Sequence, residues 1–249
     1  MNEGERMPEL SVIVPSLSPP SELPVVQRLD RTASADFELL VRDDQTVTAA
    51  RNAGIRRASA DKLVFLDDDS RPCEGYLSRA ASVLDREAAV AGRTVHPRDD
   101  VFARRLTGHY DFGPESRYVD RFWGCNMAVR ADVFDTVGTW NEGFSWGHEE
   151  KELADRVRES FPIYYDPDLV VAHSYADSIP DYWHKMYRLE TQTPYYWECR
   201  GVSRRRQWLR IVQYALDPTN YAGLSPPHAA ARFGGSVAKT LGRLRGMVR

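Results

Sequence analysis

Short apolar runs alternate with longer, more polar stretches along the first two thirds of the chain. The first three runs cover residues 10–15, 37–41 and 62–66, and they are rich in β-branched and large apolar side chains. Runs of this length and composition are typical of buried strands. Each gap between them has room for one helix, which predicts βαβ units and a parallel sheet.

Further elements follow from periodicity. Apolar residues three or four apart predict helices at 23–29, 49–58, 76–86, 131–137 and 149–159, with Gly138 as the C-terminal cap of the fourth. More strands are expected at 88–95, 122–129 and within 162–173, whereas 97–120 is interpreted as a long irregular excursion. The predicted fold class is α/β, with a mixed, mostly parallel central sheet flanked by helices.

Beyond residue 178 the pattern becomes helical, and Pro218, Pro226 and Pro227 interrupt it. We therefore expect an α/β domain over residues 1–178 and a helical, basic C-terminal extension over 179–249. After residue 201 the only acid is Asp217. The basic residues of that stretch are Arg204, Arg205, Arg206, Arg210, Arg232, Lys239, Arg243, Arg245 and Arg249.

Apolar positions at helical spacing lie beside these basic residues, at 208–216 and at 237–244. Basic amphipathic helices bind anionic membrane surfaces, so a membrane surface is one predicted partner. The alternative is a pair of surface helices packed on the α/β domain.

Bulk properties exclude several classes of protein. The net charge of −3 does not predict a nucleic acid partner. No run of about 18 apolar residues is present, which argues against a transmembrane helix. Residues 1–9 do not have the apolar stretch of a signal peptide. The three cysteines form no CxxC pair, which favours a reduced, cytoplasmic location, with the basic helices at the cytoplasmic face of a membrane.

Candidate chemistry gathers where the first three strands end. Pro15 and Ser16 follow the first strand, Asp43 and Asp44 the second, and Asp67 to Asp69 the third. Parallel strands bring these ends to one edge of the sheet, where ligands bind in open α/β folds. Five aspartates at one edge repel each other, and a hard divalent cation relieves that repulsion. The predicted site therefore binds a metal ion and phosphate oxygens.

Five segments, taken together and in this order, resemble family 2 glycosyltransferases over roughly residues 10–175. They are Ser11-Val12-Ile13-Val14-Pro15, Ala50-Arg51-Asn52-Ala53-Gly54, Phe65-Leu66-Asp67-Asp68-Asp69, Trp123-Gly124-Cys125-Asn126-Met127-Ala128-Val129-Arg130 and Trp146-Gly147-His148-Glu149-Glu150-Lys151-Glu152-Leu153. The resemblance implies a GT-A fold and an inverting, hexosyltransferase-type enzyme. Such an enzyme moves a sugar from a nucleotide-diphosphate donor to a hydroxyl of a saccharide or lipid-linked acceptor, with Mg²⁺ or Mn²⁺ as cofactor.

The resemblance also implies roles for single residues. Glu150 falls on the catalytic base. The donor-binding positions are Pro15, Ser16, Asp43, Asp44, Arg51, Asp67 and Asp68. Asp69 matches the metal-holding residue of the family's DxD motif, and His173 matches a further metal ligand. The acceptor side comprises Trp123, Asn126, Trp146 and Glu149.

Plainer interpretations stay open beside these roles. Glu150 fits an ordinary first-turn acid of a helix, His173 a structural histidine, and the aspartate triplet a solvated turn. Two departures from the family pattern are Ser16-Leu17-Ser18 after the first strand and a glutamate in place of aspartate at the base position.

Two other classes of function remain as alternatives. A sugar nucleotidyltransferase is expected to have a glycine-rich, basic loop after its first strand, and residues 15–20 contain neither glycine nor a basic residue. A nucleotide-sugar-binding module without catalysis needs no base, so the importance of Glu150 separates it from an enzyme.

Overall fold

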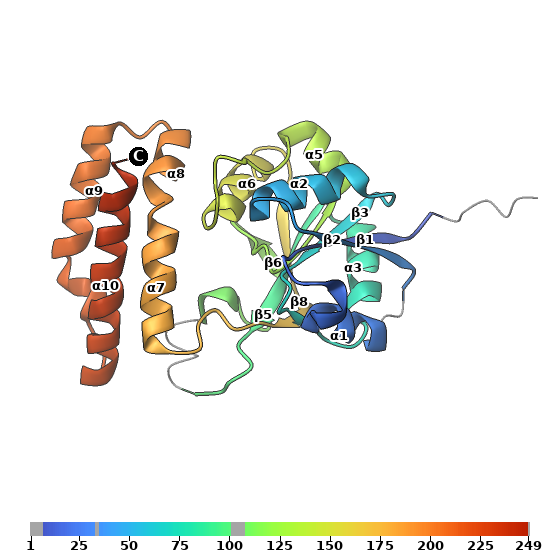
Figure 1. Cartoon of the computed structure of the whole chain (residues 1–249), viewed down its shortest axis with the longest axis horizontal. Helices are drawn as coiled ribbons and strands as arrows, with labels where there is room; N and C mark the ends of the chain where they lie inside the picture. Colours follow the sequence, from blue (N-terminus) through green and yellow to red (C-terminus); the bar gives the residue numbers. More distant parts are fainter. Residues whose placement is uncertain (1–6, 33–34, 101–107, 249) are drawn as a thin grey trace, which may run out of the picture.

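The computed structural model describes residues 7–32, 35–100 and 108–248. A sheet covered by helices on both faces forms one part, and a bundle of long helices from the C-terminal region lies beside it (Figure 1). The helical extension is therefore present as predicted. The division into two domains at residue 178 stays a prediction.

The described residues contain one mixed sheet in the order β2-β1-β3-β7-β5-β8-β4, with β6 paired to β8. Its strands are β1 (Leu10–Pro15), β2 (Phe37–Arg42), β3 (Lys62–Leu66), β4 (Arg71–Pro72), β5 (Ala89–Val95), β6 (Arg117–Val119), β7 (Asn126–Arg130) and β8 (Ile163–Ala172). The two longest registers, β1 with β2 and β5 with β8, are parallel, and β1 is also parallel to β3. The three carboxyl ends therefore meet at one edge, as the sequence predicts.

Strand β7 runs antiparallel between β3 and β5, and it begins later than predicted. Residues 122–125 are not strand, because the chain turns there and the Asn126 amide donates to the Trp123 carbonyl at 2.9 Å. The short strands β4 and β6 were not predicted. They cover two and three residues, too few to leave a period in the sequence.

Helices cover both faces of the sheet. Helices α1 (Pro24–Thr32) and α3 (Tyr76–Leu84) pack on one face, and α2 (Val47–Arg57), α5 (Ala131–Val137) and α6 (Glu149–Val157) pack on the other (Figure 1). Strand β3 shows the consequence for the sequence. Val64 and Leu66 point into the first core and Leu63 and Phe65 into the second, so the strand is apolar from Leu63 onwards. Short 3₁₀ turns lie at Pro20–Glu22, Gly108–Tyr110 and Pro218–Tyr221.

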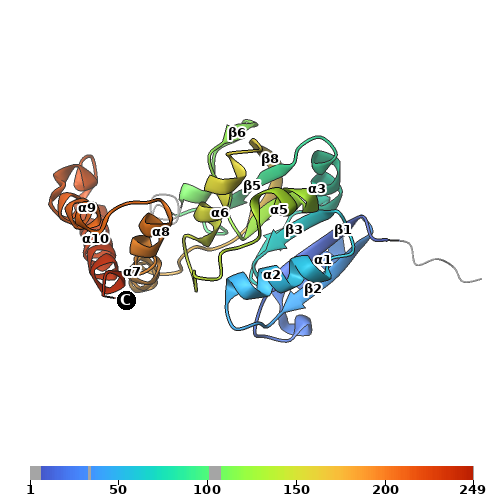
Figure 2. The same ribbon diagram turned by 90° about the horizontal axis from the view of Figure 1, so that it is seen from above.

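The C-terminal bundle consists of α7 (Ile179–Glu190), α8 (Thr193–Cys199), α9 (Arg204–Leu216) and α10 (Pro226–Gly246). Helices α7 and α8 lie between the sheet and the outer pair α9 and α10 in both views (Figures 1 and 2). Helix α10 approaches α7 closely, since a Cβ at Gly242 would lie 2.5 Å from the Tyr187 carbonyl oxygen. Within the part of the chain that is described, no helix has the length and apolar character needed to cross a membrane.

Candidate active site

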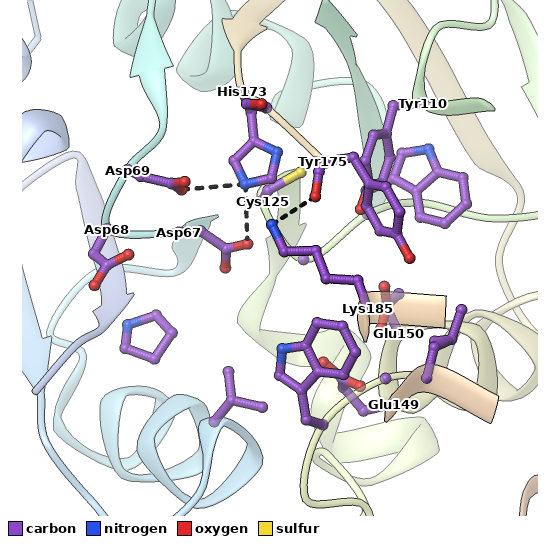
Figure 3. A pocket seen from close by; sticks show the side chains of 18 of the residues that line it. Asp67, Asp68, Asp69, Tyr110, Cys125, Glu149, Glu150, His173, Tyr175 and Lys185 are labelled. Carbon is purple, nitrogen blue, oxygen red and sulfur yellow. Dashed lines mark hydrogen bonds and ion pairs between the residues drawn. The ribbon is translucent and has the colours of Figure 1, made fainter. Parts of the chain in front are cut away.

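A pocket of about 350 Å³ lies at the carboxyl edge of the sheet, where it meets the start of α6 and the inner face of α7 (Figure 3). It brings together ten of the residues predicted from the sequence. These are Pro15, Arg51, Asp67, Asp68, Asp69, Trp123, Trp146, Glu149, Glu150 and His173. Residues up to 158 positions apart in the sequence, from Pro15 to His173, thus share one cavity.

Three predicted donor-side residues lie outside the lining of this pocket. Ser16 stands directly behind it, and its hydroxyl donates to Asp68 Oδ2 at 2.7 Å. Asp44 forms two hydrogen bonds with Arg42, at 2.9 and 3.1 Å, and Asp43 is exposed. The structure thus gives Ser16 a contact that orients Asp68, whereas Asp43 and Asp44 follow β2 and do not line the pocket.

Asn126, predicted on the acceptor side, is fully buried between strands. Its amide nitrogen donates to the carbonyls of Arg93 at 2.9 Å and Leu169 at 3.1 Å, and its carbonyl accepts from the Tyr76 hydroxyl at 2.8 Å. These contacts join β5, β7 and β8. The structure therefore places Asn126 outside the pocket, as a cross-link within the sheet.

His173, at the end of β8, faces the aspartates that follow β3. Its Nε2 lies 3.1 Å from Asp69 Oδ1 and 3.8 Å from Asp67 Oδ2 (Figure 3). Burial alone would lower the pKa of His173, but the hydrogen bond to Asp69 and the charge of Asp67 raise it. The same contact lowers the pKa of Asp69 against the opposing effect of burial. His173 and the carboxylates of Asp67 and Asp69 therefore form a compact charged group.

The chemistry of this group fits a hard divalent cation. His173 Nε2 lies near a carboxylate oxygen of Asp67 and one of Asp69, so the group offers carboxylate oxygens and an imidazole nitrogen. One atom each from Asp67, Cys125 and His173 lies within 4.8 Å of the others. Burial raises the pKa of the Cys125 thiol well above its usual range, which keeps it protonated. Hard cations prefer oxygen to sulfur, so the carboxylates suit such a cation better than the Cys125 thiol does.

Arg51 connects the aspartates that follow β3 to the first acid of α6. Its guanidinium is buried, and it donates to Asp67 Oδ1 at 3.0 Å and to Glu149 Oε1 at 3.3 Å. The group also stacks 4.5 Å from the centre of the Trp140 ring. Gly124 makes room for it, because a Cβ there would lie 2.3 Å from Arg51 Nη2. Arg51 therefore orients both the metal-side aspartate and the first acid of α6.

Glu149 and Glu150 open helix α6 after an unusual turn. Gly147 and His148 both adopt left-handed backbone conformations, with φ of 87° and 65°. For a non-glycine residue such a conformation costs about 1–2 kcal/mol, and strained residues cluster at functional sites. The turn places both carboxylates at the N-terminus of the helix, where its dipole stabilises negative charge.

Glu150 has the environment of a general base. Its Oε2 is buried and finds no hydrogen-bond partner among the residues that the structure describes. Burial, and next the charge of Glu149, raise the pKa of Glu150 well above its usual range, although Arg51 opposes the shift. A carboxylate with a raised pKa is a stronger base once it is deprotonated.

The sequence did not predict several residues of the pocket. Tyr110 and Tyr175 form an aromatic wall with Trp123, at ring distances of 4.7 and 5.5 Å from Tyr110 to the other two. Helix α7 contributes Lys185, Arg188 and Leu189. Lys185 donates to the Tyr175 carbonyl at 2.7 Å, and Arg188 lies 4.6 Å above the Trp146 ring. In the sequence, the one local sign of this part of the pocket is the number of aromatic residues in 108–123. The basic residues of α7 give no such sign, because single basic residues on a helix do not indicate a site.

This sheet, with an acidic pocket at its carboxyl edge, has the architecture of a GT-A glycosyltransferase. The profile of "Glycosyl transferase family 2" matches residues 12–138, slightly more than half of the chain. The chain therefore belongs to glycosyl transferase family 2, and the protein is a glycosyltransferase.

A curated relative and two solved structures are similar to this chain. "Glycosyltransferase AglE" of Haloferax volcanii is 27% identical over 211 residues, which cover 79% of this chain and 68% of the relative. The crystal structure of S. aureus TarS 1-349 aligns with a TM-score of 0.51 at 14% identity, over 92% of this chain and 70% of that one. A second TarS structure gives a TM-score of 0.50 at 15% identity, over 88% of this chain and 46% of TarS. At these identities the TarS structures support the GT-A fold alone.

Proposed function

We propose that the protein transfers a sugar from a nucleoside-diphosphate donor to an acceptor hydroxyl, with inversion at the anomeric carbon. The observation that supports it best is the meeting of two chemistries in one pocket. Asp67, Asp69 and His173 form an acidic edge suited to a cation, and Glu150, whose buried Oε2 has no hydrogen-bond partner among the described residues, lines the same cavity. The first suits a diphosphate leaving group, and the second suits a hydroxyl that must lose a proton.

On the donor side, Asp67, Asp69 and His173 would hold Mg²⁺ or Mn²⁺. The cation supplies charge stabilisation for the diphosphate as it leaves, worth several kcal/mol. Ser16 fixes Asp68 beside them through its hydroxyl. Arg51 holds Asp67 in place and keeps its own positive charge within the pocket lining. These contacts preorganise the acidic edge before the donor binds.

On the acceptor side, Glu150 takes the proton of the attacking hydroxyl. The acceptor oxygen forms a bond to the anomeric carbon while the bond from that carbon to the phosphate oxygen breaks. The electron pair leaves with the nucleoside diphosphate, and a single displacement inverts the configuration. Trp146 and Trp123 line the pocket near Glu150 and offer aromatic faces to a saccharide ring.

A screen of nucleotide sugars tests the donor class. UDP-, GDP- and dTDP-sugars are added to the full chain with Mn²⁺, Mg²⁺ or EDTA, and thermal unfolding is followed. One donor series with a divalent cation is expected to raise the unfolding free energy by about 2.7 kcal/mol at 100 times its Kd. The shift should disappear in EDTA. Stabilisation by free nucleoside triphosphates with a sugar phosphate, and by none of the sugar nucleotides, would instead indicate a nucleotidyltransferase.

We also propose that the outer helices α9 and α10 dock on an anionic membrane surface. Helix α9 exposes Trp208, Leu209, Val212 and Leu216, and α10 exposes Phe233, Val237 and Leu241. Arg205, Arg206, Arg210 and Arg245 are exposed on the same helices. Arg243 and Lys239, which the sequence grouped with them, contact Glu190 inside the bundle. The lipid-facing charge is therefore smaller than the sequence indicates, and the proposal rests more on the apolar residues.

Replacing Leu216 and Val237 by serine is expected to weaken binding to vesicles of anionic phospholipid about tenfold. Both side chains are exposed, Leu216 to 75% and Val237 to 43%, so the bundle should keep its stability. Sedimentation with vesicles at low salt measures the binding, with neutral phosphatidylcholine vesicles and a Thr219→Ser variant as controls. If the unmodified protein stays in the supernatant with anionic vesicles, the membrane proposal is wrong.

A further inference from the structure

Four polar side chains connect the last helix of the bundle to the turn before Glu150. Arg243 of α10 donates to both oxygens of Glu190 at the end of α7, at 2.7 and 3.1 Å. The Thr193 hydroxyl at the start of α8 donates to Glu190 Oε2 at 2.6 Å. His148 Nε2 lies 2.7 Å from Thr193 Oγ1. These residues form one continuous path from α10 to the N-terminus of α6.

Each hydrogen bond of the path has a defined direction. The Thr193 hydroxyl has one proton, which it gives to the Glu190 carboxylate, so it accepts from His148. His148 Nε2 therefore bears a hydrogen. Burial lowers the pKa of His148 to about 4, so the ring is neutral at physiological pH. The pKa of Glu190 is lowered, because the Arg243 contact outweighs the effect of burial. The path is fully paired and does not need a bound ligand.

The backbone of His148 explains why an anchor is needed there. It is the single described non-glycine residue with positive φ, and it is the N-cap residue of α6 without a capping hydrogen bond from its own side chain. A strained residue persists when its surroundings hold it. Here the ring is held by Thr193 and stacks on Tyr196, with ring centres 5.5 Å apart. The Tyr196 hydroxyl contacts Asp155 farther along α6, so α8 holds that helix at two points.

We propose that the path from Arg243 through Glu190 and Thr193 to His148 is a positioning device for Glu150. The C-terminal bundle holds the left-handed turn, and the turn sets where the carboxylate at the start of α6 points. Its four members are positioning residues, since none of them needs to contact the reacting atoms. The bundle thus completes the transferase site from outside the sheet. This inference rests on the proposed role of Glu150 as the base.

Thr193→Val tests the path with little change of shape. The variant keeps the volume of the side chain but removes the hydroxyl that joins His148 to Glu190. We expect kcat to fall about tenfold with donor KM unchanged within twofold, because a small misplacement of a catalytic group slows the reaction without weakening donor binding. Thr193→Ser restores the hydroxyl and should recover most of the rate. Thr240→Val is the matched control, since that hydroxyl bonds only to Ser236 in its own helix.

A double-mutant cycle separates positioning from general loosening. His148→Asn tolerates the left-handed backbone but has a side chain too short to reach Thr193. If the two residues act through one hydrogen bond, the double variant is no slower than the slower single variant. The proposal would be overturned if the two losses of kcat multiply in the double variant, or if Thr193→Val has a normal kcat.

The rate is measured in a hydrolysis assay. The substrate is the sugar nucleotide that stabilises the protein most, and the released nucleoside diphosphate is quantified. Glu150→Gln is assayed in parallel. If Glu150→Gln is inactive and Thr193→Val is fully active, the base assignment stands and the positioning path falls. A fully active Glu150→Gln overturns both, because the path would then have no base to position.

Discussion

Glu150→Gln is expected to lower turnover roughly 10²–10⁴-fold, which is the usual contribution of a general base. The amide has nearly the size of the carboxyl group but cannot take a proton from the acceptor hydroxyl. Donor affinity should persist, because the donor side of the pocket lies on the aspartate edge and does not include this side chain. Sugar transfer or slow donor hydrolysis at saturating donor measures the rate, and calorimetry measures the donor Kd.

Two variants of the same helix serve as controls for this result. Glu149→Gln should reduce turnover less. Glu149 pairs with Arg51 and would act on the reaction only by orienting the Arg51 side chain. Glu152→Gln should leave the rate nearly unchanged, because Glu152 bonds to Arg156 away from the pocket. A helix-dipole role alone would change only stability, by about 0.3–1 kcal/mol for either acid of the first turn.

The pH profile provides an independent test of the same residue. Burial and the charge of Glu149 raise the pKa of Glu150, and only its deprotonated form can accept a proton. The wild-type rate should therefore rise with pH through that raised pKa, and Glu150→Gln should lose this limb of the profile. Full activity in Glu150→Gln would remove Glu150 from the mechanism and leave Glu149 as the next candidate on the same motif.

Asp69→Asn is expected to weaken metal-dependent donor binding about 100-fold, or about 2.8 kcal/mol. The amide preserves the shape of the side chain and a hydrogen bond to His173, but it removes a charged oxygen ligand from the acidic edge. The residual binding should become insensitive to Mn²⁺. Calorimetric titration with the nucleoside diphosphate, with Mn²⁺ and with EDTA, measures both changes.

Asp61→Asn is the matched control for Asp69→Asn. Asp61 is an exposed aspartate just before β3, at the opposite end of the strand from the acidic triplet. Its replacement should leave the Mn²⁺ dependence of nucleotide binding unchanged. Equal, metal-dependent affinity in Asp69→Asn and the wild-type protein would show that Asp69 does not hold the cation.

Local patterns in the sequence predicted the elements that form the sheet because both of its faces are covered. The strands β1 and β3 are mostly apolar, as is typical of strands buried on both faces. The glycine after α5 was also predictable, since Gly138 caps that helix with a positive φ. The parallel direction of the first three strands then placed Ser16 and Asp67 to Asp69 at one edge.

Other features depend on contacts between distant segments. Asn126 belongs to a motif that resembles the acceptor side, yet strands β5 and β8 and helix α3 converge on its side chain and bury it. Arg51 was expected to touch the donor, but Asp67 and Glu149 approach it from β3 and α6. No local period records such a meeting, because the partners lie 16 and 98 positions away.

The sequence alone determined the α/β fold, the acidic edge and the first acids of α6, because strand burial, strand direction and helix starts are set by neighbouring residues. Only the tertiary structure decided that α7 closes the pocket with Lys185 and Arg188, and that Glu190 takes Arg243 out of the exposed basic surface. In the sequence, a single basic residue on an amphipathic helix gives the same pattern whether its side chain faces solvent, a ligand or a buried acid. The packing of α10 against α7 makes that choice, and it depends on side chains about fifty positions apart.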